Sequence, residues 1–104
     1  MIYLISRHAG AIEWLTETIN QPCTLIDHLT EEMEFKSSDW VIGTLPLPKI
    51  ATICAQGARF FLLEVEVPKQ LRGIDLSKQQ LIELGAQLTE YRCERVSRDR
   101  KSVV

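Results

Sequence analysis

Four short apolar runs are spaced along the chain, and each has the composition of a strand. The first is apolar throughout, which is typical of a strand buried on both faces of a sheet, and the last ends in an alternation that predicts departure from the core. The four runs cover residues 2–5, 23–26, 40–43 and 60–67. The stretches that follow the first and third runs carry apolar residues at helical spacing instead. Strands that alternate with helices predict an α/β domain with a mainly parallel sheet, helices on both faces and right-handed crossovers.

The boundaries of the first two helices are marked by turn-forming and capping residues. One helix follows residues 6–10 and ends at the Asn-Gln-Pro sequence of residues 20–22. The other has prolines in its first turn, where a missing N–H costs little, and ends by Gly57. We expect Thr44 or Leu45 at its cap.

A third helix is predicted near the end of the chain. Ser77 and Gln80 have the spacing of a capping box, in which each residue satisfies a free N–H group of the other. The apolar residues that follow on one helical face are Leu81, Leu84, Leu88 and Tyr91. We therefore predict one helix from Ser77 through Tyr91.

Length and charge limit the classes of protein that this chain can belong to. It has 104 residues, which predicts one domain over residues 1–94 and a basic tail of little order over residues 95–104. There are 12 basic and 14 acidic residues, for a formal net charge of -2. This balance argues against a broad basic surface for long nucleic acid and leaves a small anionic ligand possible.

The cellular compartment is predicted from what the sequence lacks. No apolar run is long enough to span a bilayer, and the first residues lack the basic region of a signal peptide. The three cysteines, Cys23, Cys54 and Cys93, are an odd number at wide spacings, so we expect free thiols. A cytoplasmic protein that does not associate with a membrane is expected.

Two loops are the candidates for a ligand site. Residues 6–10 follow the first strand and residues 43–46 follow the third. The carboxyl ends of parallel strands lie at the same end of a sheet, where ligands bind at the switch point. Each loop also leads into a helix N-terminus, whose free N–H groups favour an anion such as phosphate.

Several side chains of these loops could bind phosphate. Ser6 and Thr44 offer hydroxyl groups, and Arg7 can contact phosphate with two N–H groups. The other candidate ligand-binding residues are Gly10, Trp14, Gly43, Leu45, Lys49 and Arg72. More ordinary roles exist for these: Gly10 could simply form a turn, Lys49 could be a solvated lysine, and the ring of Trp14 could pack in the core instead of stacking on a base.

His8 is the candidate acid or base. An unperturbed imidazole titrates near pH ~6.5, which suits proton transfer at neutral pH. His28 follows the second strand and ranks lower, because no anion-binding group accompanies it. The sequence has no metal-ligand spacing and no glycine-rich nucleotide motif, so we expect chemistry without a metal or cofactor.

Three spaced motifs are Ser6-Arg7-His8-Ala9-Gly10-Ala11-Ile12-Glu13-Trp14, Val41-Ile42-Gly43-Thr44-Leu45-Pro46 and Gly57-Ala58-Arg59-Phe60-Phe61. Together they resemble a small CRISPR-associated family, the ring nucleases of type III CRISPR systems. The resemblance covers about residues 1–91. It implies a compact Rossmann-like fold related to the domains that sense cyclic oligoadenylates, and ring-nuclease activity on cyclic tetra-adenylate.

In such an enzyme a ribose 2′-hydroxyl attacks the adjacent phosphorus in line and leaves a 2′,3′-cyclic phosphate. The resemblance assigns phosphate binding to Ser6, Arg7, Thr44 and the two helix N-termini, and proton transfer to His8 as base or leaving-group acid. The candidate catalytic residues are thus Ser6, Arg7 and His8. A homodimer that places two sites around one ring fits the pseudo-symmetry of the ligand.

Three alternatives remain open at this stage. A binding module could sequester the cyclic messenger without cleaving it. A histidine phosphatase is a second alternative, because Arg7-His8 resembles the R-H-G motif of that family, although Ala9 intervenes and only His28 could be a second histidine. The third is an adaptor protein of the CRISPR locus, whose loops are simply turns.

Overall fold

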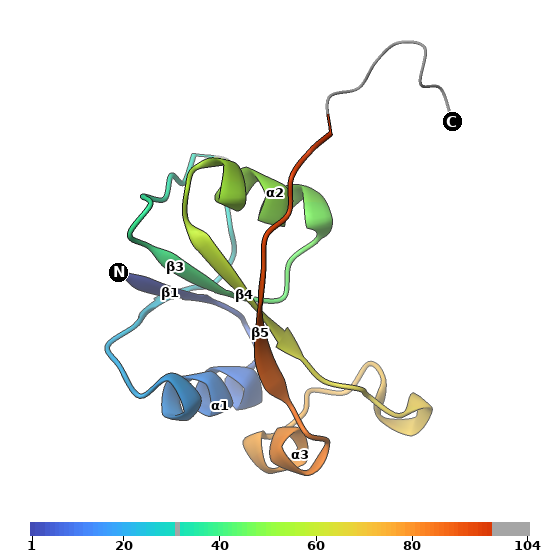
Figure 1. Cartoon of the computed structure of the whole chain (residues 1–104). Coiled ribbons are helices and arrows are strands. Elements are labelled where there is room, and N and C mark those ends of the chain that lie inside the picture. Colours follow the sequence, from blue (N-terminus) through green and yellow to red (C-terminus); the bar gives the residue numbers. More distant parts are fainter. Residues whose placement is uncertain (31, 97–104) are drawn as a thin grey trace, which may run out of the picture.

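A five-stranded sheet organises residues 1–30 and 32–96, the part of the chain that this computed structural model describes (Figure 1). Its strands are β1 (Ile2–Ile5), β2 (Thr24–Ile26), β3 (Trp40–Gly43), β4 (Arg59–Glu64) and β5 (Gln87–Tyr91). Their order across the sheet is β2-β1-β3-β4-β5. The first four strands are parallel and β5 is antiparallel to β4. The predicted α/β class and mainly parallel sheet are confirmed.

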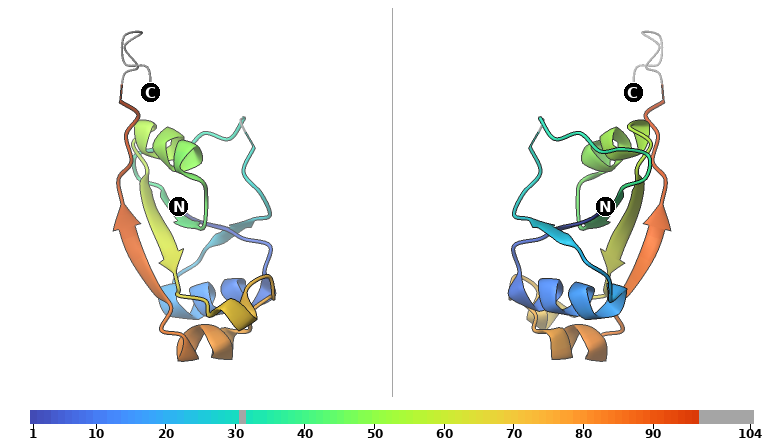
Figure 2. Two further views of the ribbon diagram at one scale, coloured as in Figure 1. Left: turned by 90° about the vertical axis from the view of Figure 1, so that its right-hand side faces the viewer. Right: turned by 90° about the vertical axis from the view of Figure 1, so that its left-hand side faces the viewer.

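Helices cover both faces of this sheet (Figure 2). They are α1 (Ala9–Ile19), α2 (Leu47–Ala55) and α3 (Lys78–Glu83), with a short 3₁₀ helix η1 (Lys69–Leu71) before α3. On the α1 and α3 face the core consists of Leu4, Trp14, Leu15, Ile42 and Leu81. On the α2 face it consists of Ile5, Phe35, Val41, Ile50, Ile53, Ala58 and Phe60. Successive strand residues thus enter opposite cores, which explains why β1 and β3 are apolar throughout.

The ends of α1 and α2 follow local backbone rules. Asn20 ends α1 in the left-handed conformation, with φ at 52°, and its N–H donates to the carbonyl oxygen of Thr16. The cap of α2 is Pro46, so our prediction of Thr44 or Leu45 was wrong. The Pro46 carbonyl accepts the first helical hydrogen bonds, and its extended backbone leaves Thr44 and Leu45 in the loop after β3.

The last predicted helix is wrong in its second half. Ser77 and Gln80 do form the capping box, but the helix ends at Glu83 and the chain returns along β4 as β5. Gly85 has φ at 76°, its N–H donates to Ile82 O at 3.1 Å, and Ala86 N–H donates to Leu81 O at 3.0 Å. This pair of bonds is a Schellman motif, which glycine permits and which stops a helix.

Other boundaries differ in detail from the prediction. β4 begins one residue early, at Arg59, and ends at Glu64, so residues 65–67 leave the sheet as their alternation indicated. The three cysteines are free thiols. Arg95, in the predicted tail, donates to Pro48 O and Thr52 Oγ1 on α2, whereas the tail prediction for residues 97–104 lies outside the described residues. Within the described ranges, no helix is both long and apolar enough to cross a membrane.

Candidate functional site at the switch point of the sheet

The switch point of the sheet lies between β1 and β3. From β1 the chain passes through α1 to β2, whereas from β3 it passes through α2, on the opposite face, to β4. The two crossovers therefore diverge and leave a space beyond the carboxyl ends of these strands. A cavity of about 360 Å³ occupies that place. Its polar lining residues are Ser6, Arg7, His8, Asp27, His28 and Thr44.

The predicted loops do converge on this cavity. Ser6, Arg7 and His8 line it after β1, and Gly43, Thr44 and Leu45 line it after β3. The register explains the convergence, because Ile5 of β1 pairs with Gly43 of β3. The two loops thus lie at the same end of the sheet, as predicted.

The loop after β1 is fixed by short-range hydrogen bonds. Ser6 N–H donates to Ile26 O at 3.2 Å, which ties the loop to β2. The Ser6 hydroxyl oxygen accepts from His8 N–H at 3.2 Å, which leaves its own O–H free to donate. His8 caps α1 with an extended backbone and no side-chain cap bond. The first N–H groups of α1 are therefore not satisfied by the cap side chain.

The His8 side chain has a partner that the sequence analysis missed. His8 Nδ1 lies 2.7 Å from Asp75 Oδ1, in the segment that leads into α3. Both side chains are well exposed, at 65% for His8 and 81% for Asp75. Nδ1 is thereby engaged, and Nε2 is the nitrogen left for a ligand.

The loop after β3 depends on a glycine at the end of the strand. A Cβ added at Gly43 would lie 2.5 Å from Ile5 O, so a larger residue would force β1 and β3 apart at the cavity. Thr44 is exposed and Leu45 packs partly against the α2-side core. Gly43 thus shapes the site through the backbone, and Thr44 supplies the hydroxyl.

Gly10 and Trp14 do not line the cavity, and both lie in packed parts of the protein. A Cβ added at Gly10 would lie 2.0 Å from Leu76 O, so the glycine allows α1 to contact the segment before α3. Trp14 is only 8% exposed and packs in the core with Leu4 and Leu15. Stacking of its ring on a base is not supported by this position.

Lys49 and Arg72 also lie away from the cavity. Lys49 lines a separate hollow between α2 and the segment before β3, together with Thr52 and Arg95. Arg72 follows η1, where its Nε donates to Val67 O at 3.4 Å. Neither residue is a wall of the cavity at the switch point.

Asp27 and His28 complete the cavity from β2. They follow directly after Ile26, which pairs with Ile5 of β1, so the strand order carries them to the same end. From the sequence we ranked His28 below His8 and did not single out Asp27. The available indication was their position immediately after a strand.

Taken together, fold and site define a small doubly wound α/β protein with a polar cavity at the switch point of its sheet, lined by two histidines and an arginine. The chain belongs to a family of CRISPR-associated proteins. Residues 3–94 match the family described as "Putative CRISPR-associated protein (Cas_VVA1548)". Comparison with curated proteins and with solved structures gives no match. The predicted CRISPR association is confirmed by the family match.

Proposed function

We propose that this protein is a ring nuclease that binds cyclic tetra-adenylate at the switch-point cavity and cleaves it to linear di-adenylate with a 2′,3′-cyclic phosphate. Cleavage would switch off type III CRISPR signalling. The observation that carries the proposal is the convergence of Ser6, Arg7 and His8 with Thr44 on one cavity. These residues supply the donors for a phosphate and one group for proton transfer.

Phosphate recognition would combine three kinds of donor. The Arg7 guanidinium can donate two parallel hydrogen bonds to phosphoryl oxygens. Ser6 and Thr44 add hydroxyl groups from the two loops. The free N–H groups at the start of α1 favour the same negative charge. This set would also stabilise the charge that develops on the phosphoryl oxygens in the transition state.

The reaction needs one proton acceptor and one proton donor. As the O2′–P bond forms, His8 Nε2 takes the proton of the 2′-hydroxyl group. As the P–O5′ bond breaks, O5′ takes a proton, and His28 is the second titratable imidazole on the cavity that can supply it. The electron pair of the broken bond stays on O5′. No water is consumed, and the products are a 5′-hydroxyl and a 2′,3′-cyclic phosphate.

The size of the cavity favours an assembly of two copies. At about 360 Å³ it is at the small end of the range for small-molecule sites, roughly 300–1,000 Å³. A ring of four nucleotides is larger than one such cavity. A two-fold dimer would present two cavities to opposite sides of the ring, and cleavage in both would release two di-adenylates.

The test is product analysis under multiple turnover. Purified protein is incubated with cyclic tri-, tetra- and hexa-adenylate in EDTA, and products are separated by liquid chromatography and identified by mass. Linear di-adenylate with a cyclic phosphate, in excess over protein, is expected from the tetra-adenylate ring. Intact rings that co-elute with the protein would mean sequestration, and intact rings without binding would return the protein to the adaptor class.

Paired arginine variants test whether this cavity is the site. Arg7→Gln should weaken binding by about 10-fold to 100-fold, the range for loss of a hydrogen bond to a charged group. Arg72→Gln removes the same charge from an arginine outside the cavity and serves as the matched control. Equal losses in both variants would place the ligand elsewhere.

A further inference from the structure

We propose that Asp75 is a positioning residue for His8, holding the imidazole through Nδ1 so that Nε2 is the nitrogen that exchanges the proton. The inference deepens the proposed function and rests on it. Asp75 lies outside the three sequence motifs and does not line the cavity itself. Its role is to act through His8.

The contact determines which nitrogen carries a proton. A separation of 2.7 Å between His8 Nδ1 and Asp75 Oδ1 is that of a charge-assisted hydrogen bond. An ionised carboxylate can only accept, so Nδ1 must be the donor. In the neutral imidazole, Nε2 then has a free lone pair. This is the form that a general base for a 2′-hydroxyl group requires.

The segment that carries Asp75 is held firmly against α1. Leu76 follows Asp75 in the sequence and lies very close to Gly10 of α1. A Cβ added at Gly10 would lie only 2.0 Å from Leu76 O, so only glycine permits this approach. The next residue, Ser77, exchanges the two bonds of the capping box with Gln80, at 2.9 and 3.1 Å. The chain is therefore fixed directly after Asp75, close to the first turn of α1.

A purely structural role for the Asp75 carboxylate has little support. The cap of α3 is already supplied by Ser77 and Gln80. An ion pair as exposed as that of His8 and Asp75 contributes little to folding in water. A ligand that covers the pair would exclude water and strengthen the hydrogen bond. Asp75 should thus affect the rate of cleavage more than stability.

The first experiment measures the tautomer of His8 by long-range ¹H–¹⁵N spectroscopy at a pH where the imidazole is neutral. The chain has only two histidines, so His28→Gln assigns the signals. We expect Nδ1 to be protonated in the wild type and in Asp75→Asn, whose amide oxygen can still accept. Asp75→Ala should lose this preference. Glu83→Gln, which removes one charge from the end of α3, is the control that should leave His8 unchanged.

The second experiment measures cleavage in single and double variants. Asp75→Ala should lower kcat by about 10-fold to 100-fold, within the range of one acid–base contribution, and leave KM within about twofold. His8→Ala/Asp75→Ala should be no slower than His8→Ala alone, because Asp75 acts through the imidazole. Asp75→Asn should fall between wild type and Asp75→Ala.

The outcomes separate this inference from the proposed function. If the wild type cleaves no ring, the ring-nuclease proposal fails, and the tautomer measurement still decides whether Asp75 positions His8. If Asp75→Ala keeps the wild-type tautomer, or slows cleavage by the same factor with and without His8, Asp75 is not a positioning residue.

Discussion

The two ends of the sheet use the same types of polar residue in opposite ways. At the carboxyl ends of β1 and β3, polar side chains line an open cavity. At the amino ends of β3 and β4, Asp39 and Arg59 are instead paired with other groups of the protein, although Arg59 also lines a hollow of about 590 Å³. Asp39, directly before β3, is 5% exposed and accepts from Lys36 N–H at 2.8 Å, and one of its oxygens lies 3.4 Å from the Met1 amino group.

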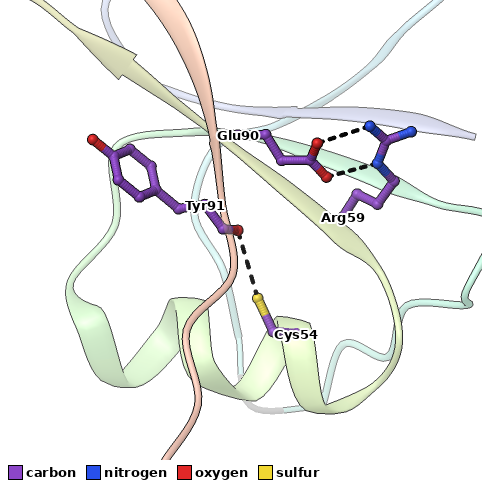
Figure 3. A network of polar contacts seen from close by, with 4 residues as sticks. All are labelled: Cys54, Arg59, Glu90 and Tyr91. Atoms are coloured by element: carbon purple, nitrogen blue, oxygen red, sulfur yellow. Dashed lines mark hydrogen bonds and ion pairs between the residues drawn. The ribbon is translucent and has the colours of Figure 1, made fainter.

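Arg59 on β4 is likewise paired with another side chain. Its guanidinium donates two hydrogen bonds to the Glu90 carboxylate of β5, at 2.7 and 2.8 Å (Figure 3). It also lies over the rings of Trp40 and Phe61, at 4.9 and 5.3 Å from their centroids. The hydrogen bonds to Glu90 raise the pKa of Arg59, and those from Arg59 lower the pKa of Glu90.

Beside this pair, the chain that leaves β5 is bound to α2. Cys54 Sγ lies 3.9 Å from Tyr91 O (Figure 3). Cys93 N–H donates to the same sulfur at 3.4 Å. The amino end thus joins β4, β5 and α2. Since Asp39, Arg59 and Glu90 already have protein partners, substitutions of these residues should change stability, whereas substitutions at the carboxyl end should change ligand chemistry.

The largest expected effect separates the two ends most sharply. His8→Ala should lower the cleavage rate by about 10²-fold to 10⁴-fold, because it removes the proposed proton-transfer group. Its melting temperature should stay close to that of the wild type, since the side chain is exposed and does not cap α1. Multiple-turnover cleavage assays and thermal unfolding measure both quantities. An unchanged rate would remove His8 from the chemistry, and a large loss of stability would end the contrast between the two ends.

The next effect is on stability at the amino end. Asp39→Asn should destabilise the fold by about 1–3 kcal/mol, because both Lys36 N–H and the Met1 amino group need an acceptor and the buried amide offers only one, so its N–H₂ group faces one of these donors. Denaturant unfolding at neutral pH measures the loss. Glu83→Gln, an exposed carboxylate on α3, is the control with the same change of charge. Cleavage by Asp39→Asn should match the wild type wherever the protein is folded.

The same variant has a characteristic pH dependence. The hydrogen bond from Lys36 N–H holds the pKa of Asp39 below its usual value of 3.8. A carboxylate with a lowered pKa in the folded state stabilises the fold above its usual pKa, and this contribution is lost as the pH falls through the lowered value. The difference between wild type and Asp39→Asn should therefore shrink below pH 3.8. A constant difference down to strongly acidic pH would show that the charge of Asp39 is irrelevant.

The sequence predicted which strands and loops carry the cavity residues better than it predicted the contacts among those residues. The apolar runs of β1 and β3 and the parallel arrangement were enough to bring Ser6, Arg7 and His8 to the end of the sheet where Thr44 lies. Contacts between residues far apart in the chain could not be predicted. Nothing near Asp75 in the sequence indicates its contact with His8. Such a pairing arises only when α3 packs beside α1.

Helical spacing of apolar residues gave a wrong prediction where a single glycine turns the backbone. Leu81, Leu84 and Leu88 have helical spacing, yet Gly85 turns the chain and Leu88 belongs to β5. The sequence also left two roles open for Trp14, which belongs to the same motif as Ser6 and His8 but packs in the core between α1 and the sheet. Neighbours in a motif can thus serve the site and the core separately.

The smallest expected effect tests whether the amino end is held by a specific pair or by packing. Arg59→Met and Glu90→Gln should each lower the melting temperature slightly, by less than Asp39→Asn, because both side chains are about half exposed and such pairs are screened by solvent. The double variant should lose less than the sum of the two single losses, since each substitution disrupts the same ion pair. Thermal unfolding of all four proteins at low and high salt measures this coupling, which salt should weaken. Strictly additive losses would assign the role of Arg59 to its stacking on Trp40 and Phe61 and not to Glu90.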